Sequence, residues 1–171
     1  PSSIISIRDS VYAADLLFAA VGHLDFFTRL GEGPMELNSI VSAFGIKARP
    51  ASVMLTYFIA LGLVERVGDT YTITDQAREH LTATSQWSLA PYISTQLERP
   101  IVARMLEVLR TDTPASWGAK KNEQEWAKAM ERNDFADMFT AGMDSRGAFF
   151  APGLAATFNF SAYPSVIDIA G

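Results

Sequence analysis

The chain has 171 residues, of which 49% are hydrophobic and 19% charged, and its net charge is −5. This composition excludes intrinsic disorder over most of the length, and the acidic balance argues against nucleic acid as the main partner. Cysteine is absent, which excludes disulfides, thiolate catalysis and thiolate metal sites and fits a cytoplasmic protein.

The first predicted element is a helix from Asp9 to Leu30, which Asp9 or Ser10 can cap and Gly22 interrupts. Apolar residues recur on it with helical spacing; they include Val11, Ala14, Leu17, Phe18 and Val21. Its other faces are apolar too, and a helix of this kind is normally buried on all sides. Near the start of a small domain such burial requires a second subunit, so we expect a homodimer formed through the N-terminal helices.

The next segment predicts two short helices followed by a hairpin. The first helix covers Leu37–Phe44, and Pro50 stands where the second can begin. Residues 64–74 alternate between apolar and polar and turn at Gly68-Asp69, which is typical of two antiparallel strands. Helix, helix, turn, helix and hairpin is the order of a winged-helix domain.

A winged helix suggests DNA binding, in which the third helix needs basic or amide side chains to reach bases and phosphates. Residues 50–64 contain no charged side chain, and Lys47 and Arg49 lie just before them. The pattern therefore favours a winged helix used for packing and dimerisation over a DNA-binding domain, and we expect no nucleic-acid partner.

Residues 88–156 are again helical in character, with prolines between the segments. A long helix is predicted from Asn122 or Glu123. Phe135, Phe139 and Met143 share one of its faces, and aromatic and thioether surfaces suit a flat ring system. Ordinary core packing is the alternative interpretation of this stripe.

Residues 166–171 predict a buried strand running into a turn, with Asp168 near its end. Because a buried parallel strand needs neighbours on both sides, we expect the chain to be part of a longer protein. An acid followed by small residues at such a turn also opens nucleotide-type sites in doubly wound folds, although any buried strand-to-helix turn can have this pattern.

Several further classes of site are not expected. His23 and His80 have no acid or hydroxyl partner at an informative spacing, so neither is assigned a catalytic role, and no metal site is predicted. The first ten residues do not have the pattern of a signal peptide. No apolar run reaches the ~20 residues of a membrane span, so no membrane partner is expected.

The order of these parts resembles the S-adenosylmethionine-dependent O-methyltransferases of the plant caffeic-acid and bacterial polyketide-tailoring type. Four segments carry the resemblance: residues 16–27, 34–81, 135–143 and 165–171. It implies a mainly helical chain with a winged-helix dimerisation domain (residues 9–86), linker helices (87–158) and the start of a Rossmann-like cofactor domain (159–171). The alternatives are a winged-helix transcriptional regulator and a dimerisation scaffold without catalysis.

The resemblance also implies roles for particular residues. Asp168 and Gly171 would contact S-adenosylmethionine, with Ala170 standing where the family's first glycine usually stands. Three residues would line the pocket for a small-molecule acceptor: Phe135, Phe139 and Met143. The family's catalytic base, a histidine that deprotonates the acceptor hydroxyl, would lie beyond the last residue of this chain. The acceptor itself, and whether the methylated atom is oxygen, nitrogen or carbon, are not determined by the resemblance.

Overall fold

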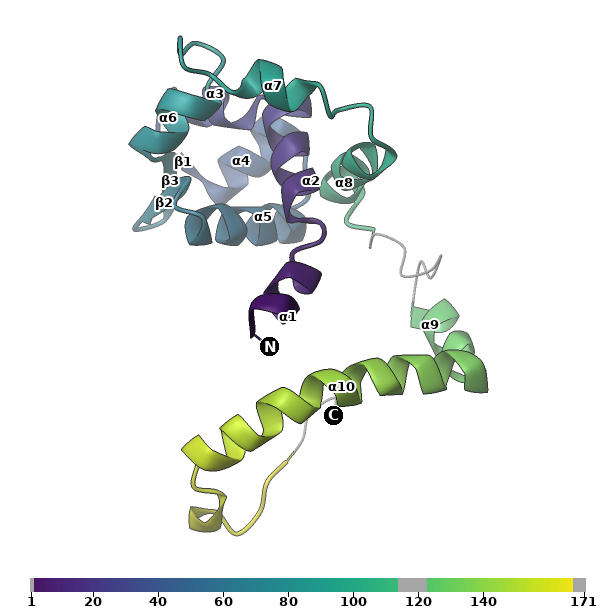
Figure 1. The fold of residues 1–171 in the computed structure, drawn as a ribbon. Coiled ribbons are helices and arrows are strands. Elements are labelled where there is room, and N and C mark those ends of the chain that lie inside the picture. Colours follow the sequence, from purple (N-terminus) through teal and green to yellow (C-terminus); the bar gives the residue numbers. More distant parts are fainter. Residues whose placement is uncertain (1, 114–122, 168–171) are drawn as a thin grey trace. The chain divides into compact units, whose positions relative to one another are not determined.

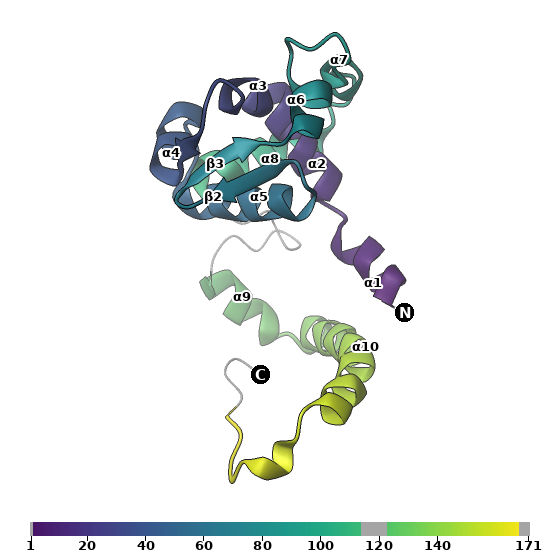
Figure 2. The ribbon, with the colours of Figure 1, turned by 90° about the vertical axis from the view of Figure 1, so that its left-hand side faces the viewer.

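The computed structural model describes residues 2–113 and 123–167, which form mainly helices and one small sheet (Figures 1 and 2). The chain divides into two compact units, one of residues 10–121 and the other of residues 1–9 with 122–171. The helices of the first unit are α2 (Ala13–Phe18), the π-helical segment η1 (Ala19–His23), α3 (Phe26–Leu30), α4 (Leu37–Phe44), α5 (Ala48–Ala60), α6 (Asp75–Leu81), α7 (Ala90–Ser94) and α8 (Pro100–Thr111). The described chain is therefore mainly helical, as predicted.

The sheet of the first unit has three antiparallel strands in the order β1-β3-β2. β2 (Val64–Val67) and β3 (Thr70–Ile73) form the predicted hairpin, with Val67 opposite Thr70 across a turn in which Gly68 has a φ of 62°. A positive φ is accessible to glycine without steric cost. β1 (Met35–Glu36) pairs with the other side of β3 and was not predicted, because two residues carry no detectable alternation.

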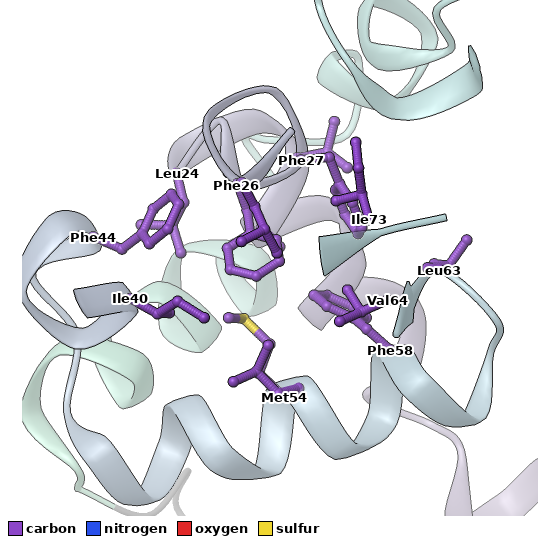
Figure 3. Packing of buried hydrophobic residues seen from close by; sticks show 14 of the residues in the cluster. Leu24, Phe26, Phe27, Ile40, Phe44, Met54, Phe58, Leu63, Val64 and Ile73 are labelled. Carbon is purple, nitrogen blue, oxygen red and sulfur yellow. The ribbon is translucent and has the colours of Figure 1, made fainter. Parts of the chain in front are cut away.

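The core of this unit is a cluster of phenylalanines from three helices (Figure 3). The ring of Phe26 lies 5.3 Å from that of Phe27, 4.9 Å from that of Phe44 and 5.7 Å from that of Phe58. Met54, fully buried on α5, belongs to the same cluster and lies on its α5 side. The helices α3, α4 and α5 are thus held together by burial of their apolar faces, the dominant favourable term in folding.

The N-terminal segment is helical, as expected, but it is not interrupted at Gly22 as predicted. α2 continues through Gly22 as η1, and the chain turns only at Asp25, whose φ is 48°. Residues of α2 and η1 pack against α7 and α8 of the same chain, so this segment is largely covered without a second subunit. Val11 and Tyr12, which precede α2, remain 61% and 47% exposed.

The end of α8 is attached to the start of α5. The backbone N–H of Lys47 donates a hydrogen bond to the Leu109 carbonyl at 2.8 Å. The Nε of Arg49 donates to Asp112 at 2.8 Å, and this hydrogen bond is the main reason why the pKa of the Arg49 guanidinium is raised. α8, which lies in the predicted linker range, therefore packs with the first unit.

The described elements of the second unit are α1 (Ser2–Asp9), α9 (Glu123–Met130), α10 (Asn133–Thr157) and the 3-10 turn η2 (Phe160–Ala162). The prediction of one long helix here is wrong, because the chain turns at Glu131 and Arg132. Residues 165–167 have no regular secondary structure, and the remainder of the predicted terminal strand lies outside the described residues. Among the described helices, none combines the length and apolarity that a bilayer crossing requires.

Candidate functional site

The turn between α9 and α10 carries an exposed ion pair at the start of α10. Arg132 donates two hydrogen bonds to Asp134, from Nη2 to Oδ2 at 2.6 Å and from Nε to Oδ1 at 3.2 Å. These hydrogen bonds are the largest cause of the lowered pKa of Asp134, and they raise the pKa of Arg132. Asp134 also lies in the first turn of α10, where unpaired backbone N–H groups favour a negative charge.

This turn brings Trp126 of α9 against two of the residues predicted to line the acceptor pocket. The indole ring lies 5.6 Å from the ring of Phe135 at 85° and 5.0 Å from the ring of Phe139 at 84°. Edge-to-face arrangements of this kind are a preferred geometry of aromatic pairs. Both phenylalanines are half-buried, so part of each ring remains accessible.

Met143, the third predicted pocket residue, lies further along α10 and is 43% exposed. The three predicted pocket residues therefore differ in their surroundings. Phe135 and Phe139 pack against Trp126, whereas the thioether of Met143 is exposed. The contact of Trp126 with these rings was missed because nine residues separate it from Phe135, so one continuous helix would place the two side chains about 180° apart on opposite sides. The signal for the turn is Asn133-Asp134, since both residue types are favoured at helix starts.

The rest of α10 also presents apolar side chains that its own unit leaves uncovered. No residue of α10 is buried, and its exposed apolar side chains include Phe149 (55%), Phe150 (53%) and Leu154 (56%). The Arg146 guanidinium lies 5.7 Å from the centre of the Phe150 ring and 3.2 Å from the Asp9 carboxylate. Uncovered apolar surface of this extent marks a region that contacts another surface or a ligand.

The exposed face of α5 is apolar as well. Val53 and Ile59 are 59% and 39% exposed, and Thr56 lies between them on the same face. The single cation of α5, Arg49, is paired with Asp112. This face has neither the charge to neutralise phosphates nor the Arg, Lys, Asn or Gln side chains that make bidentate contacts to bases.

The predicted cofactor residues Asp168 and Gly171 lie outside the described residues. In the part of the chain that is described, no group of three or more His, Asp and Glu side chains could hold a metal ion. His80 lies in the last turn of α6, with its Nδ1 3.4 Å from the Trp87 carbonyl oxygen. His23 ends η1 and is exposed.

Comparisons with known proteins identify relatives of this chain. No family model matches it. Over its whole length it is 30% identical to the tetracenomycin polyketide synthesis 8-O-methyl transferase TcmO of Streptomyces glaucescens, of which it covers 50%. It is also 24% identical, again over its whole length, to the 3-hydroxy-5-methyl-1-naphthoate 3-O-methyltransferase of Streptomyces sahachiroi, of which it covers 49%. The chain thus spans about half the length of the curated relatives that it matches.

A solved structure of similar fold leads to the same group of proteins. An O-methyltransferase family 2 protein from Planctomyces limnophilus, crystallised with apigenin, superposes on 64% of this chain with a TM-score of 0.62 and 29% identity. The matched part is 34% of that protein. All three of these proteins are named as O-methyltransferases, which confirms the family resemblance predicted from the sequence.

Proposed function

We propose that this chain is the N-terminal part of an S-adenosylmethionine-dependent O-methyltransferase that methylates a hydroxyl group of a small aromatic or polyketide-like metabolite. The observation that carries this proposal is the 30% identity to the tetracenomycin 8-O-methyl transferase along the whole chain. The second curated relative acts on a hydroxynaphthoate, and the solved neighbour holds apigenin. All three names point to acceptors that are small molecules.

In this proposal residues 9–86 are a winged-helix dimerisation domain, residues 87–158 are linker helices and residues 159–171 begin a Rossmann-like cofactor domain. Support for the first part comes from the order of α3, α4, α5 and the β2–β3 hairpin, with β1 as a third strand. Support for a homodimer through the N-terminal helices comes from Val11 and Tyr12, which are exposed just before α2. Val53 and Ile59 give α5 a further exposed apolar face on which a second copy could pack.

Bound S-adenosylmethionine would supply an electrophilic methyl group on a sulfonium, so the protein's main tasks are orientation, exclusion of water and removal of the acceptor's proton. Phe135, Phe139 and Met143 would hold the flat acceptor and keep water from the reacting oxygen. Asp168 would accept hydrogen bonds from the cofactor, and Gly171 would let the backbone approach it closely. The base would lie beyond the last residue of this chain.

The test is methyl transfer by the complete protein that contains this chain. It is incubated with S-adenosylmethionine and a panel of phenols of one to four fused rings, and the products are analysed by mass spectrometry. We expect at least one acceptor to gain a methyl group while S-adenosylhomocysteine forms. We also expect Asp168→Ala to weaken S-adenosylmethionine binding in calorimetry. A protein that binds neither the cofactor nor any acceptor would contradict the proposal.

A DNA-binding regulator is the alternative that a winged helix suggests, and the same protein tests it. The uncharged, apolar face of α5 predicts no binding in a fluorescence titration with duplex DNA at low salt. Binding tighter than about 1 μM that weakens steeply with added salt would favour the regulator. A homodimer that binds neither DNA nor S-adenosylmethionine would instead favour the non-catalytic scaffold.

A further inference from the structure

We infer that Trp126 is a positioning residue for the acceptor: it sets the orientation of the Phe135 and Phe139 rings, against which a flat acceptor would lie. Because this role presupposes an acceptor on α10, it rests on the proposed methyl transfer. Trp126 would act through the two phenylalanines, and nothing in the family resemblance assigns it a function.

The inference starts from the way in which one indole contacts two rings. Phe135 and Phe139 are one helical turn apart on α10, and Trp126 is perpendicular to both, with centroids 5.6 and 5.0 Å away. A single rigid ring placed across both phenylalanines restricts the side-chain rotation of each. Two half-buried rings that would otherwise turn freely become one wall of defined shape.

The indole itself is only partly accessible. Ala129, one turn after Trp126 on α9, is 2% exposed. Arg132 and Asp134 form an exposed ion pair at the turn that follows. Trp126 is half-buried, so its own helix and the two rings that it contacts restrict its position.

Phe135, Phe139 and Met143 together form what we call the acceptor wall, the surface on which the acceptor would lie. This arrangement divides the acceptor wall into a fixed part and an adaptable part. Met143 is 43% exposed, and its unbranched thioether can adjust to ligands of different shape. The pair held by Trp126 would select for planar ring systems, and Met143 would tolerate variation at their margin. Removal of the indole should therefore affect planar acceptors most and leave the cofactor unaffected.

The experiment compares Trp126→Leu, Trp126→Phe and wild type in the complete protein, with Lys128→Ala as a control. Lys128 is exposed on the same helix. For the best planar acceptor we expect Trp126→Leu to raise KM about tenfold, a typical effect of losing one apolar contact. The KM for S-adenosylmethionine should stay within about twofold. Trp126→Phe should restore most of the acceptor affinity, and Lys128→Ala should behave as wild type.

A second measurement remains decisive if Trp126→Leu does not fold. The chain has three tryptophans, so replacing Trp87 and Trp117 with Phe leaves Trp126 as its single indole. If the complete protein has others, they are replaced as well. A planar acceptor that rests on Phe135 and Phe139 should then change the emission of Trp126, with the same midpoint as its KM, whereas S-adenosylmethionine alone should not.

The outcomes separate this inference from the proposed function. An acceptor that is methylated by wild type with no emission change, or with unchanged KM in Trp126→Leu, would overturn the positioning role and leave methyl transfer intact. An equal loss for the acceptor and the cofactor would also overturn it, because that result indicates a purely structural residue. Absence of methyl transfer by wild type would overturn both.

Discussion

The carboxylate of Asp15 lies 3.0 Å from the guanidinium of Arg99, yet its Oδ1 accepts no hydrogen bond within the described part of the chain. Asp15 is on α2 and its side chain is 5% exposed, whereas the side chain of Arg99, the residue before α8, is 46% exposed. A buried carboxylate oxygen that accepts no hydrogen bond depends on its ion partner. This pair therefore links α2 to the start of α8.

The first prediction concerns the loss of that partner. Arg99→Ala should destabilise the protein by about 1–3 kcal/mol, reduced from a fully buried pair because Arg99 is half exposed. Arg104→Ala, which breaks an exposed pair with Glu107, should cost less than about 1 kcal/mol. Urea unfolding measures both variants. Equal destabilisation by Arg99→Ala and Arg104→Ala would mean that the burial of Asp15 is energetically unimportant. Asp15→Leu in the Arg99→Ala background should recover part of the stability that Arg99→Ala loses.

The second prediction tests the close approach of η1 to the segment before α8. A Cβ on Gly22 would lie 2.3 Å from the Cδ2 of Leu97, so Gly22→Ala should destabilise by about 1–3 kcal/mol through overpacking. The double variant Gly22→Ala/Leu97→Ala should be more stable than the sum of the two single changes predicts. Additive effects in thermal unfolding would show that Leu97 moves aside without cost.

The third prediction is the pH dependence of the first turn of α10. Because the folded pKa of Asp134 is below its ordinary 3.8, its stabilising effect is fully present above that value. The effect is lost as the pH falls through the lowered pKa of the folded state. The protection of the Phe135 and Ala136 amides against exchange, corrected for the intrinsic pH dependence of the exchange rate, should therefore fall only in this acidic range, and Asp134→Asn should abolish the dependence. Asp137→Asn, the control, leaves the pair with Arg132 in place and should retain it.

The fourth prediction tests dimerisation through the exposed face of α5. Val53 is 59% exposed, so Val53→Asp should convert a dimer of the complete protein to monomers without lowering the stability of the monomer much. Tyr92→Asp changes an exposed residue of α7 and serves as the control that should remain dimeric. Sedimentation at micromolar concentration measures both. A wild-type protein that is already monomeric would contradict the prediction.

The fifth prediction separates the two parts of the acceptor wall. Met143 is 43% exposed, so Met143→Ala should cost less than about 1 kcal/mol of stability while changing acceptor KM. Phe139→Ala should affect both, because the ring also packs on Trp126. Melting temperature and acceptor kinetics are measured together. A large stability loss with unchanged KM in Met143→Ala would assign that residue to ordinary core packing.

Local patterns predicted much of the first unit correctly. The helix Leu37–Phe44 has its predicted bounds, and the hairpin turns at Gly68-Asp69. Both elements have strong local signals, namely a repeated apolar face and residues suited to the turn. The strand β1 and the turn at Glu131-Arg132 were missed, because a two-residue strand and a helix corner leave little periodic pattern to detect.

The sequence by itself determined the helical character, the absence of thiol chemistry, the uncharged face of α5 and the family resemblance, since all of these depend on residue type and spacing along the chain. Only the tertiary structure decided what covers each apolar face. It placed α7 and α8 on α2 and η1, where a second subunit had been expected, and it folded Trp126 back onto Phe135 and Phe139. An apolar side chain gains the same free energy from any apolar partner, so its spacing predicts that it will be buried but not against which element.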